Sequence, residues 1–61
     1  MAARIRQLRR AKFWTQAELA RAVRIHPVSL ARIETGATPR LTTLRRLAKA
    51  LGVAPGELMR P

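Results

Sequence analysis

The chain has 61 residues, of which 48% are hydrophobic, and its formal net charge at pH 7 is +10. A chain of this length forms a single domain, here residues 1–61, with a core close to the smallest that folds without a disulfide or a metal. Cysteine is absent and histidine occurs once, which excludes a disulfide framework and a His/Cys zinc site. We expect no cofactor, no metal and no small-molecule ligand.

The charge is strongly one-sided, with 13 Lys and Arg residues against 3 acidic ones, and most of the basic residues are arginine. The planar guanidinium group matches phosphates and guanine edges better than an ammonium group does. Such a balance in a small domain favours a polyanionic partner. No apolar run is long enough for a membrane span or a signal segment. We therefore expect no membrane partner and a cytoplasmic location.

The first predicted helix runs from Ala2 to Lys12. Ile5 and Leu8 share one of its faces, because residues three apart lie on the same side of a helix. Arg9 lies on this apolar face as well, one turn after Ile5. A charge in that position either extends to solvent along its aliphatic stem or needs a partner, and Glu34 is the available one.

Phe13 and Trp14 interrupt the helical pattern and lead into a capping box formed by Thr15 and Glu18. The second predicted helix therefore covers about 16–23. Trp14 fits the core position before the capping box. The alternative is that Phe13 and Trp14 together form an exposed patch for a partner.

A tight turn over 24–26 follows, with Ile25 directed into the core, His26 as the cap of the third helix and Pro27 as its first residue. Gly36 is a typical stop signal beyond the end of this helix. Its inner face carries Leu30 and Ile33. The helical angle directs the following residues outward: Val28, Ala31, Arg32 and Thr35.

The fourth predicted helix covers about Leu41 to Leu51 and ends at Gly52, after a loop over 37–40. Pro55 begins one last helical turn that reaches Met59. No strand pattern or internal repeat is present. The sequence therefore predicts an all-α fold, a compact bundle of about five short helices.

Taken together, these residues resemble the Cro-type, phage-repressor-like helix-turn-helix family over nearly the whole chain. The combination of TQAELA, IETG and LRRLAKALGV carries the resemblance, since each short segment alone is common. The matching positions are Gln16, Glu18, Leu19, Ala20, Ile25, Leu30, Ile33, Glu34, Gly36, Pro39, Leu44, Leu47, Ala48, Ala50, Leu51 and Val53.

The resemblance implies that the second and third helices form the helix-turn-helix and that the third enters the major groove of DNA with its N-terminus first. In this family the positions that face base edges correspond to Pro27, Val28 and Arg32. Arg32 can form two hydrogen bonds with guanine, and Val28 can contact a thymine methyl group. The resemblance also implies an interhelical ion pair between Arg9 and Glu34.

The expected backbone contacts follow from the same resemblance. Gln16 matches a glutamine that holds a phosphate, and Arg40 with the amides near Leu41 matches a second phosphate contact. Free amides at helix N-termini suit phosphate oxygens, so Thr15 and His26 belong to the expected interface. Ser29 either contacts DNA or caps its own helix. We interpret His26 as a helix cap rather than a pH switch.

Two residues depart from the family pattern. Arg24 stands where the family often has glycine in the turn, and Phe13 also replaces a frequent glycine. A left-handed Arg24 would cost roughly 1 kcal/mol of backbone strain. The alternative is that its guanidinium group turns onto DNA.

The favoured function is a sequence-specific regulator of transcription that binds double-stranded DNA, most simply a repressor, as a weak homodimer on a palindromic site through Val53, Leu58 and Met59. The alternative is a protein-interaction module, such as an antitoxin-like or complex-assembly partner, with Phe13, Leu58 and Met59 as its surface. A non-specific nucleic-acid coat is a third reading. An enzyme is not expected, because no paired carboxylates, phosphate loop or catalytic triad can be assembled.

Overall fold

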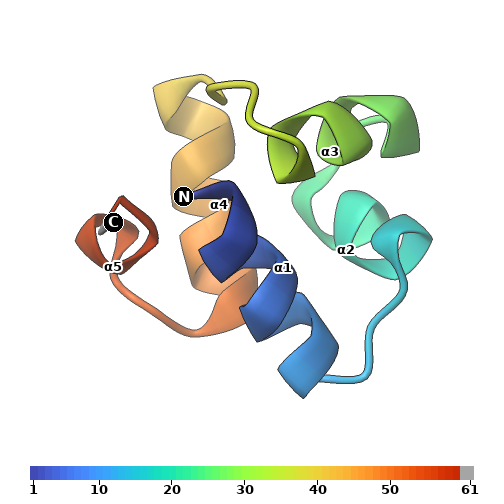
Figure 1. Ribbon diagram of the computed structural model, residues 1–61, viewed down its shortest axis with the longest axis horizontal. Coiled ribbons are helices and arrows are strands. Elements are labelled where there is room, and N and C mark those ends of the chain that lie inside the picture. Colours follow the sequence, from blue (N-terminus) through green and yellow to red (C-terminus); the bar gives the residue numbers. More distant parts are fainter. Residues whose placement is uncertain (60–61) are drawn as a thin grey trace.

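The computed structural model describes residues 1–59, and every regular element in this range is an α-helix (Figure 1). The all-α bundle of five short helices predicted from the sequence is confirmed. The first helix ends at Ala11, one residue earlier than predicted. The helices are α1 (Ala2–Ala11), α2 (Gln16–Val23), α3 (Pro27–Glu34), α4 (Leu41–Leu51) and α5 (Pro55–Leu58).

Side-chain caps determine where α2 and α3 begin. Thr15 Oγ1 accepts a hydrogen bond from the Glu18 amide at 3.1 Å, and the Glu18 carboxylate accepts one from the Thr15 amide at 2.9 Å. His26 Nδ1 accepts a hydrogen bond from the Val28 amide at 3.1 Å, directly before Pro27. These bonds satisfy amides that have no partner within their own helix. The predicted capping box and the His26 cap are both confirmed.

One apolar core joins all five helices. Helix α4 packs against α1, α2 and α5, while α3 packs against α1 and α2 (Figure 1). None of the helices in residues 1–59 combines the length and the apolar character that a membrane crossing requires. The core residues are Ile5, Leu19, Ala20, Val23, Leu30, Ile33, Leu44, Leu47, Ala48, Leu51 and Leu58.

The C-terminal turn corrects one expectation from the sequence. Leu58 is 0% exposed and forms part of the core, so it is not available for a contact between two copies of the chain. Val53 is half-buried against the same core. Met59 is 64% exposed. Because α5 folds back onto α4, Leu58 completes the core, and Met59 is the large apolar side chain that remains exposed at the end of this turn.

Trp14 lies before α2, half-buried against the core, as its position ahead of the capping box predicts. The preceding residue, Phe13, is 94% exposed. Its backbone is left-handed, with φ 57°, and Arg24 in the turn after α2 has φ 59°. Left-handed backbone is unfavourable for side chains other than glycine. Both positions where the sequence departs from the family glycine are therefore strained.

We expect Phe13→Gly to stabilise the domain by about 1 kcal/mol, because glycine adopts positive φ without strain. A gain of this size in so small a domain raises the melting temperature by roughly 4–8 °C. Thermal unfolding followed by circular dichroism measures it. The control is Phe13→Ala, which removes the same exposed ring but keeps a Cβ atom. An equal gain in both variants would assign the effect to the ring rather than to the backbone.

Candidate nucleic-acid interface

Helices α2 and α3 form one rigid unit through the turn that joins them. Arg24 ends α2 in a left-handed conformation, with φ 59° and ψ 45°. The Ile25 amide then donates a hydrogen bond to the Ala20 carbonyl at 3.0 Å. The Ile25 side chain packs against the core between the two helices. This turn fixes the angle at which α3 leaves α2.

Helix α3 has a buried face and an outward face. Leu30 and Ile33 are buried, whereas Val28 is 52% exposed. Pro27, Ser29 and Arg32 are also exposed, so the predicted base-facing residues share an open surface. This surface offers one guanidinium group, one hydroxyl group and the apolar side chain of Val28. Such a set can contact base edges through a few specific bonds and one methyl contact.

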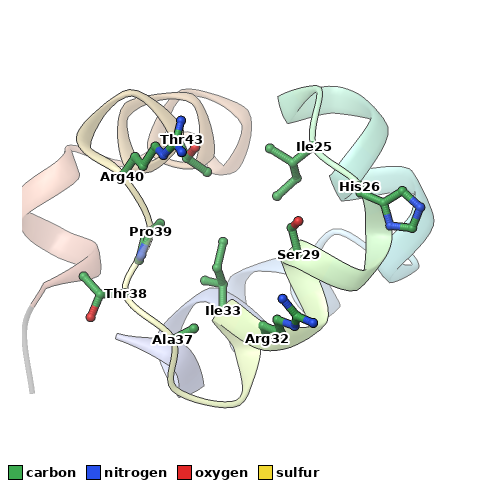
Figure 2. Close-up of a pocket in the computed structure, with 10 residues that line it drawn as sticks. All are labelled: Ile25, His26, Ser29, Arg32, Ile33, Ala37, Thr38, Pro39, Arg40 and Thr43. Atoms are coloured by element: carbon green, nitrogen blue, oxygen red, sulfur yellow. The ribbon is translucent and has the colours of Figure 1, made fainter.

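A hollow of about 420 Å³ separates α3 from the beginning of α4 (Figure 2). Arg32 and Arg40 lie on opposite sides of it, and the Ser29 hydroxyl and the Ile33 side chain point into its middle. No carboxylate is among its lining residues within the described part of the chain. The hollow is therefore cationic at its rim, and hydroxyl groups line part of its wall.

The beginning of α4 adds backbone donors on one side of this hollow. Arg40 is the N-cap residue of α4 and makes no side-chain cap bond, so the first amides, beginning at Leu41, have no cap from its side chain. Uncapped amides at a helix N-terminus attract anions. Thr38 and Thr43 also line the hollow, although the sequence reasoning did not select them. A threonine in the first turn of a helix that was expected to bind phosphate was the signal for Thr43.

A buried ion pair attaches the C-terminal end of α3 to α1. Arg9 Nε donates to Glu34 Oε2 at 2.8 Å, and Arg9 Nη2 donates to Glu34 Oε1 at 3.0 Å. The third guanidinium nitrogen donates to the Trp14 carbonyl at 2.8 Å. Arg9 thus does not extend to solvent: it holds α3 and the segment before α2 at the same time.

Two further bonds to Glu34 were not expected from the sequence. Arg6 donates to the Glu34 carbonyl at 3.0 Å, which satisfies an acceptor at the end of α3. The Gln16 side-chain amide donates to Glu34 Oε1 at 3.2 Å. The spacing of Arg6 and Arg9, three residues apart on α1, was the available signal for the first bond. Gln16, the expected phosphate contact, also supports α3 from inside the domain.

The charge state of Glu34 follows from this network. Burial raises the pKa of its carboxyl group, but hydrogen bonds from Arg9 and Gln16 and the charges of Arg9 and Arg6 outweigh that effect. The pKa of Glu34 is therefore below its ordinary value of 4.5. A carboxylate with two arginines and a glutamine beside it stays ionised at neutral pH.

The expected contacts form three groups. Pro27, Val28, Ser29 and Arg32 lie together on α3, and Arg40 with Leu41 lies across the hollow from them. Thr15 and Gln16 lie apart from both, at the beginning of α2. No cluster of residues suited to a metal ion occurs in the described range. An arrangement of cations, hydroxyls and uncapped amides on one side of a helix-turn-helix suits a polyanion.

Comparison with known proteins identifies the same architecture. The family model described as Helix-turn-helix matches residues 5–58 of the chain. No curated protein gives a significant match. No solved structure gives a significant match.

We expect the stability of the domain to fall below about pH 4.5. The pKa of Glu34 is lowered in the folded state, and so is that of Glu18, through backbone and side-chain hydrogen bonds with Thr15. Their stabilisation is therefore present above their unfolded-state pKa and is lost as the pH falls through the folded-state values. Urea unfolding between pH 7 and pH 2 measures this dependence.

The variant Glu34→Gln separates the contribution of Glu34 to this pH dependence from that of Glu18. It removes the charge opposite buried Arg9, so we expect a loss of about 3 kcal/mol at pH 7. The acid dependence that remains should then be that of Glu18. A variant with the full pH dependence of the native chain would contradict the role given to Glu34.

Proposed function

The chain belongs to the Cro-type helix-turn-helix family, and from this we propose that it is a sequence-specific regulator of transcription that contacts the major groove of DNA with α3. The outward face of α3, with Val28 and Arg32 exposed above a buried row, is the observation that carries the proposal. Most simply, the protein acts as a repressor by occupying its operator.

Base contacts in this proposal rest on few residues. Arg32 donates two hydrogen bonds to O6 and N7 of a guanine, and Val28 contacts a thymine methyl group. Pro27 and Val28 have no side-chain donor, so Arg32 carries most of the hydrogen-bonded discrimination. Ser29 lies next to this face and adds a bond to a base edge or a phosphate.

Backbone contacts hold α3 in register. In this proposal one phosphate lies at the beginning of α2, near Thr15 and Gln16, and a second lies in the hollow near Arg40 and the Leu41 amide. His26 Nδ1 accepts a hydrogen bond from the Val28 amide, so Nε2 is the ring nitrogen that can donate to a phosphate oxygen. Because Gln16 also bonds to Glu34 at 3.2 Å, a phosphate bound at Gln16 would be connected directly to the support of α3.

Two copies on neighbouring half-sites would provide the buried area that one domain of 61 residues lacks. Half-sites about one helical turn, roughly 34 Å, apart fit this arrangement. With Leu58 buried, Met59 and the exposed part of Val53 are the remaining candidates for the contact between copies.

The role of Arg32 is tested with Arg32→Ala on a duplex obtained by selection from a random pool. Loss of a bidentate contact costs about 1–3 kcal/mol, so affinity for the selected site should fall roughly 10- to 100-fold. Affinity for a random duplex should change little. Arg45→Ala is the matched control, because Arg45 is an exposed arginine on α4 that lies outside the hollow. Unchanged site preference in Arg32→Ala would refute the assignment.

Pairing on DNA is tested with a duplex that carries two half-sites and one that carries a single half-site. We expect cooperative binding to the first, and we expect Met59→Glu to remove the cooperativity while affinity for the single half-site stays nearly the same. Fluorescence anisotropy titrations at several salt concentrations measure both. Cooperativity that survives in Met59→Glu would place the contact elsewhere.

A further inference from the structure

A second hollow, of about 460 Å³, lies between the end of α2 and the C-terminal half of α4. We call it the Trp14 groove. Apolar side chains form one part of its lining and three cations form the other part. The groove is lined by Trp14, Ala22, Arg24, Arg46, Lys49 and Ala50.

The Trp14 groove is separate from the proposed DNA surface. It shares no lining residue with the hollow beside α3. In Figure 1, α3 and the first turn of α4 lie in the upper part of the view, whereas the end of α4 and the segment before α2 lie below them. None of the groove's lining residues is among the DNA contacts expected for α2, α3 and α4.

The cations of the groove have no carboxylate side chain beside them in residues 1–59. The Glu18 carboxylate accepts a hydrogen bond from the Thr15 amide at 2.9 Å, and the Glu34 carboxylate accepts one from Arg9 Nε at 2.8 Å. Glu57 Oε2 lies 3.4 Å from Arg4 Nη2. These are all the acidic residues of the chain. Within residues 1–59, no carboxylate side chain lines the groove, so an acidic partner would complement its charge.

Arg24 places a cation at the groove in a backbone conformation that is unfavourable for it. Its left-handed backbone, with φ 59°, would suit glycine without strain. Instead the chain has a guanidinium group at the rim of the groove. An observed backbone outlier of this kind is a reason to look for a function of the side chain.

We propose that the Trp14 groove is a docking site for an acidic segment of a partner protein, in which an apolar side chain is flanked by carboxylates. The apolar side chain lies against Trp14, Ala22 and Ala50, and the carboxylates pair with Arg24, Arg46 and Lys49. Charge complementarity of this kind selects and orients partners.

Other occupants fit the groove less well. A second copy of the chain fits less well, because Glu34 is buried and Glu18 and Glu57 would have to leave the contacts that they make within their own molecule. A nucleic-acid base would stack on Trp14, but Lys12 Nζ lies 5.4 Å from the centroid of that ring and covers one of its faces. Phosphates alone gain nothing from an apolar wall.

The probe is a fluorescein-labelled synthetic peptide with two leucines flanked by glutamates on both sides. We expect it to bind the native chain and to change the fluorescence of Trp14, which is the single tryptophan of the protein. A second peptide, with serines in place of the leucines, should bind at least several-fold more weakly. Equal affinity for both peptides, or no binding of the first, would overturn the proposal.

The matched variants are Arg46→Glu and Arg45→Glu, two exposed neighbours on α4 with the same change in net charge. Only Arg46 lines the groove. We expect Arg46→Glu to weaken peptide binding about tenfold or more, as for a like charge placed in an interface. Arg45→Glu should weaken it less than about threefold by screened long-range repulsion. If both variants lost the same amount of peptide affinity, the loss would be due to net charge alone, and the proposal would be overturned.

Arg24→Gly separates docking from stability. We expect this variant to unfold at a higher temperature than the native chain and yet to bind the peptide more weakly, while its affinity for duplex DNA stays close to that of Arg45→Ala, which loses the same single charge. Peptide affinity that is unchanged in Arg24→Gly would remove Arg24 from the site. A duplex affinity that falls more in Arg46→Glu than in Arg45→Glu would make the groove a nucleic-acid surface and overturn the proposal.

Discussion

The buried pair of Arg9 and Glu34 is the interaction on which the rest of the domain depends. It joins α1 to the end of α3, and the same guanidinium group holds the Trp14 carbonyl before α2. Two buried charges are costly unless each is fully hydrogen-bonded. Here Gln16 and Arg6 supply the remaining bonds around Glu34, and no buried side-chain polar atom of the described residues lacks a partner. The position of the outward face of α3 is thus set by polar contacts as well as by the core.

Local signals made much of the fold predictable. Thr15 with Glu18, and His26 with Pro27, act within one turn of their own helix, so the beginnings of α2 and α3 could be inferred without tertiary information. The outward position of Arg32 followed from helical periodicity alone. The burial of Leu58 could not be inferred in this way. A single helical turn can face the core with either of its sides, and the packing of α5 on α4 determines that the side with Leu58 is buried.

Features of the site that depend on contacts between distant segments could not be predicted from the sequence. The Trp14 groove combines residues from three segments, and Thr38 and Thr43 line the other hollow only because the loop after α3 returns past Ile33. Gln16 was expected at a phosphate, yet its amide lies 3.2 Å from Glu34. The resemblance supplied the Arg9–Glu34 pair, which angular position alone left open between pairing and solvent exposure.

All three carboxylate side chains of the chain are engaged inside the same molecule, and this has a consequence for its behaviour at high concentration. Every free copy carries a formal net charge of +10, so copies in solution repel one another. A polyanionic lattice removes that repulsion by supplying the missing negative charge. Encounters between copies are therefore favoured along such a lattice and disfavoured away from it, so pairing of the kind proposed above would depend on the local density of phosphate more than on the total amount of protein.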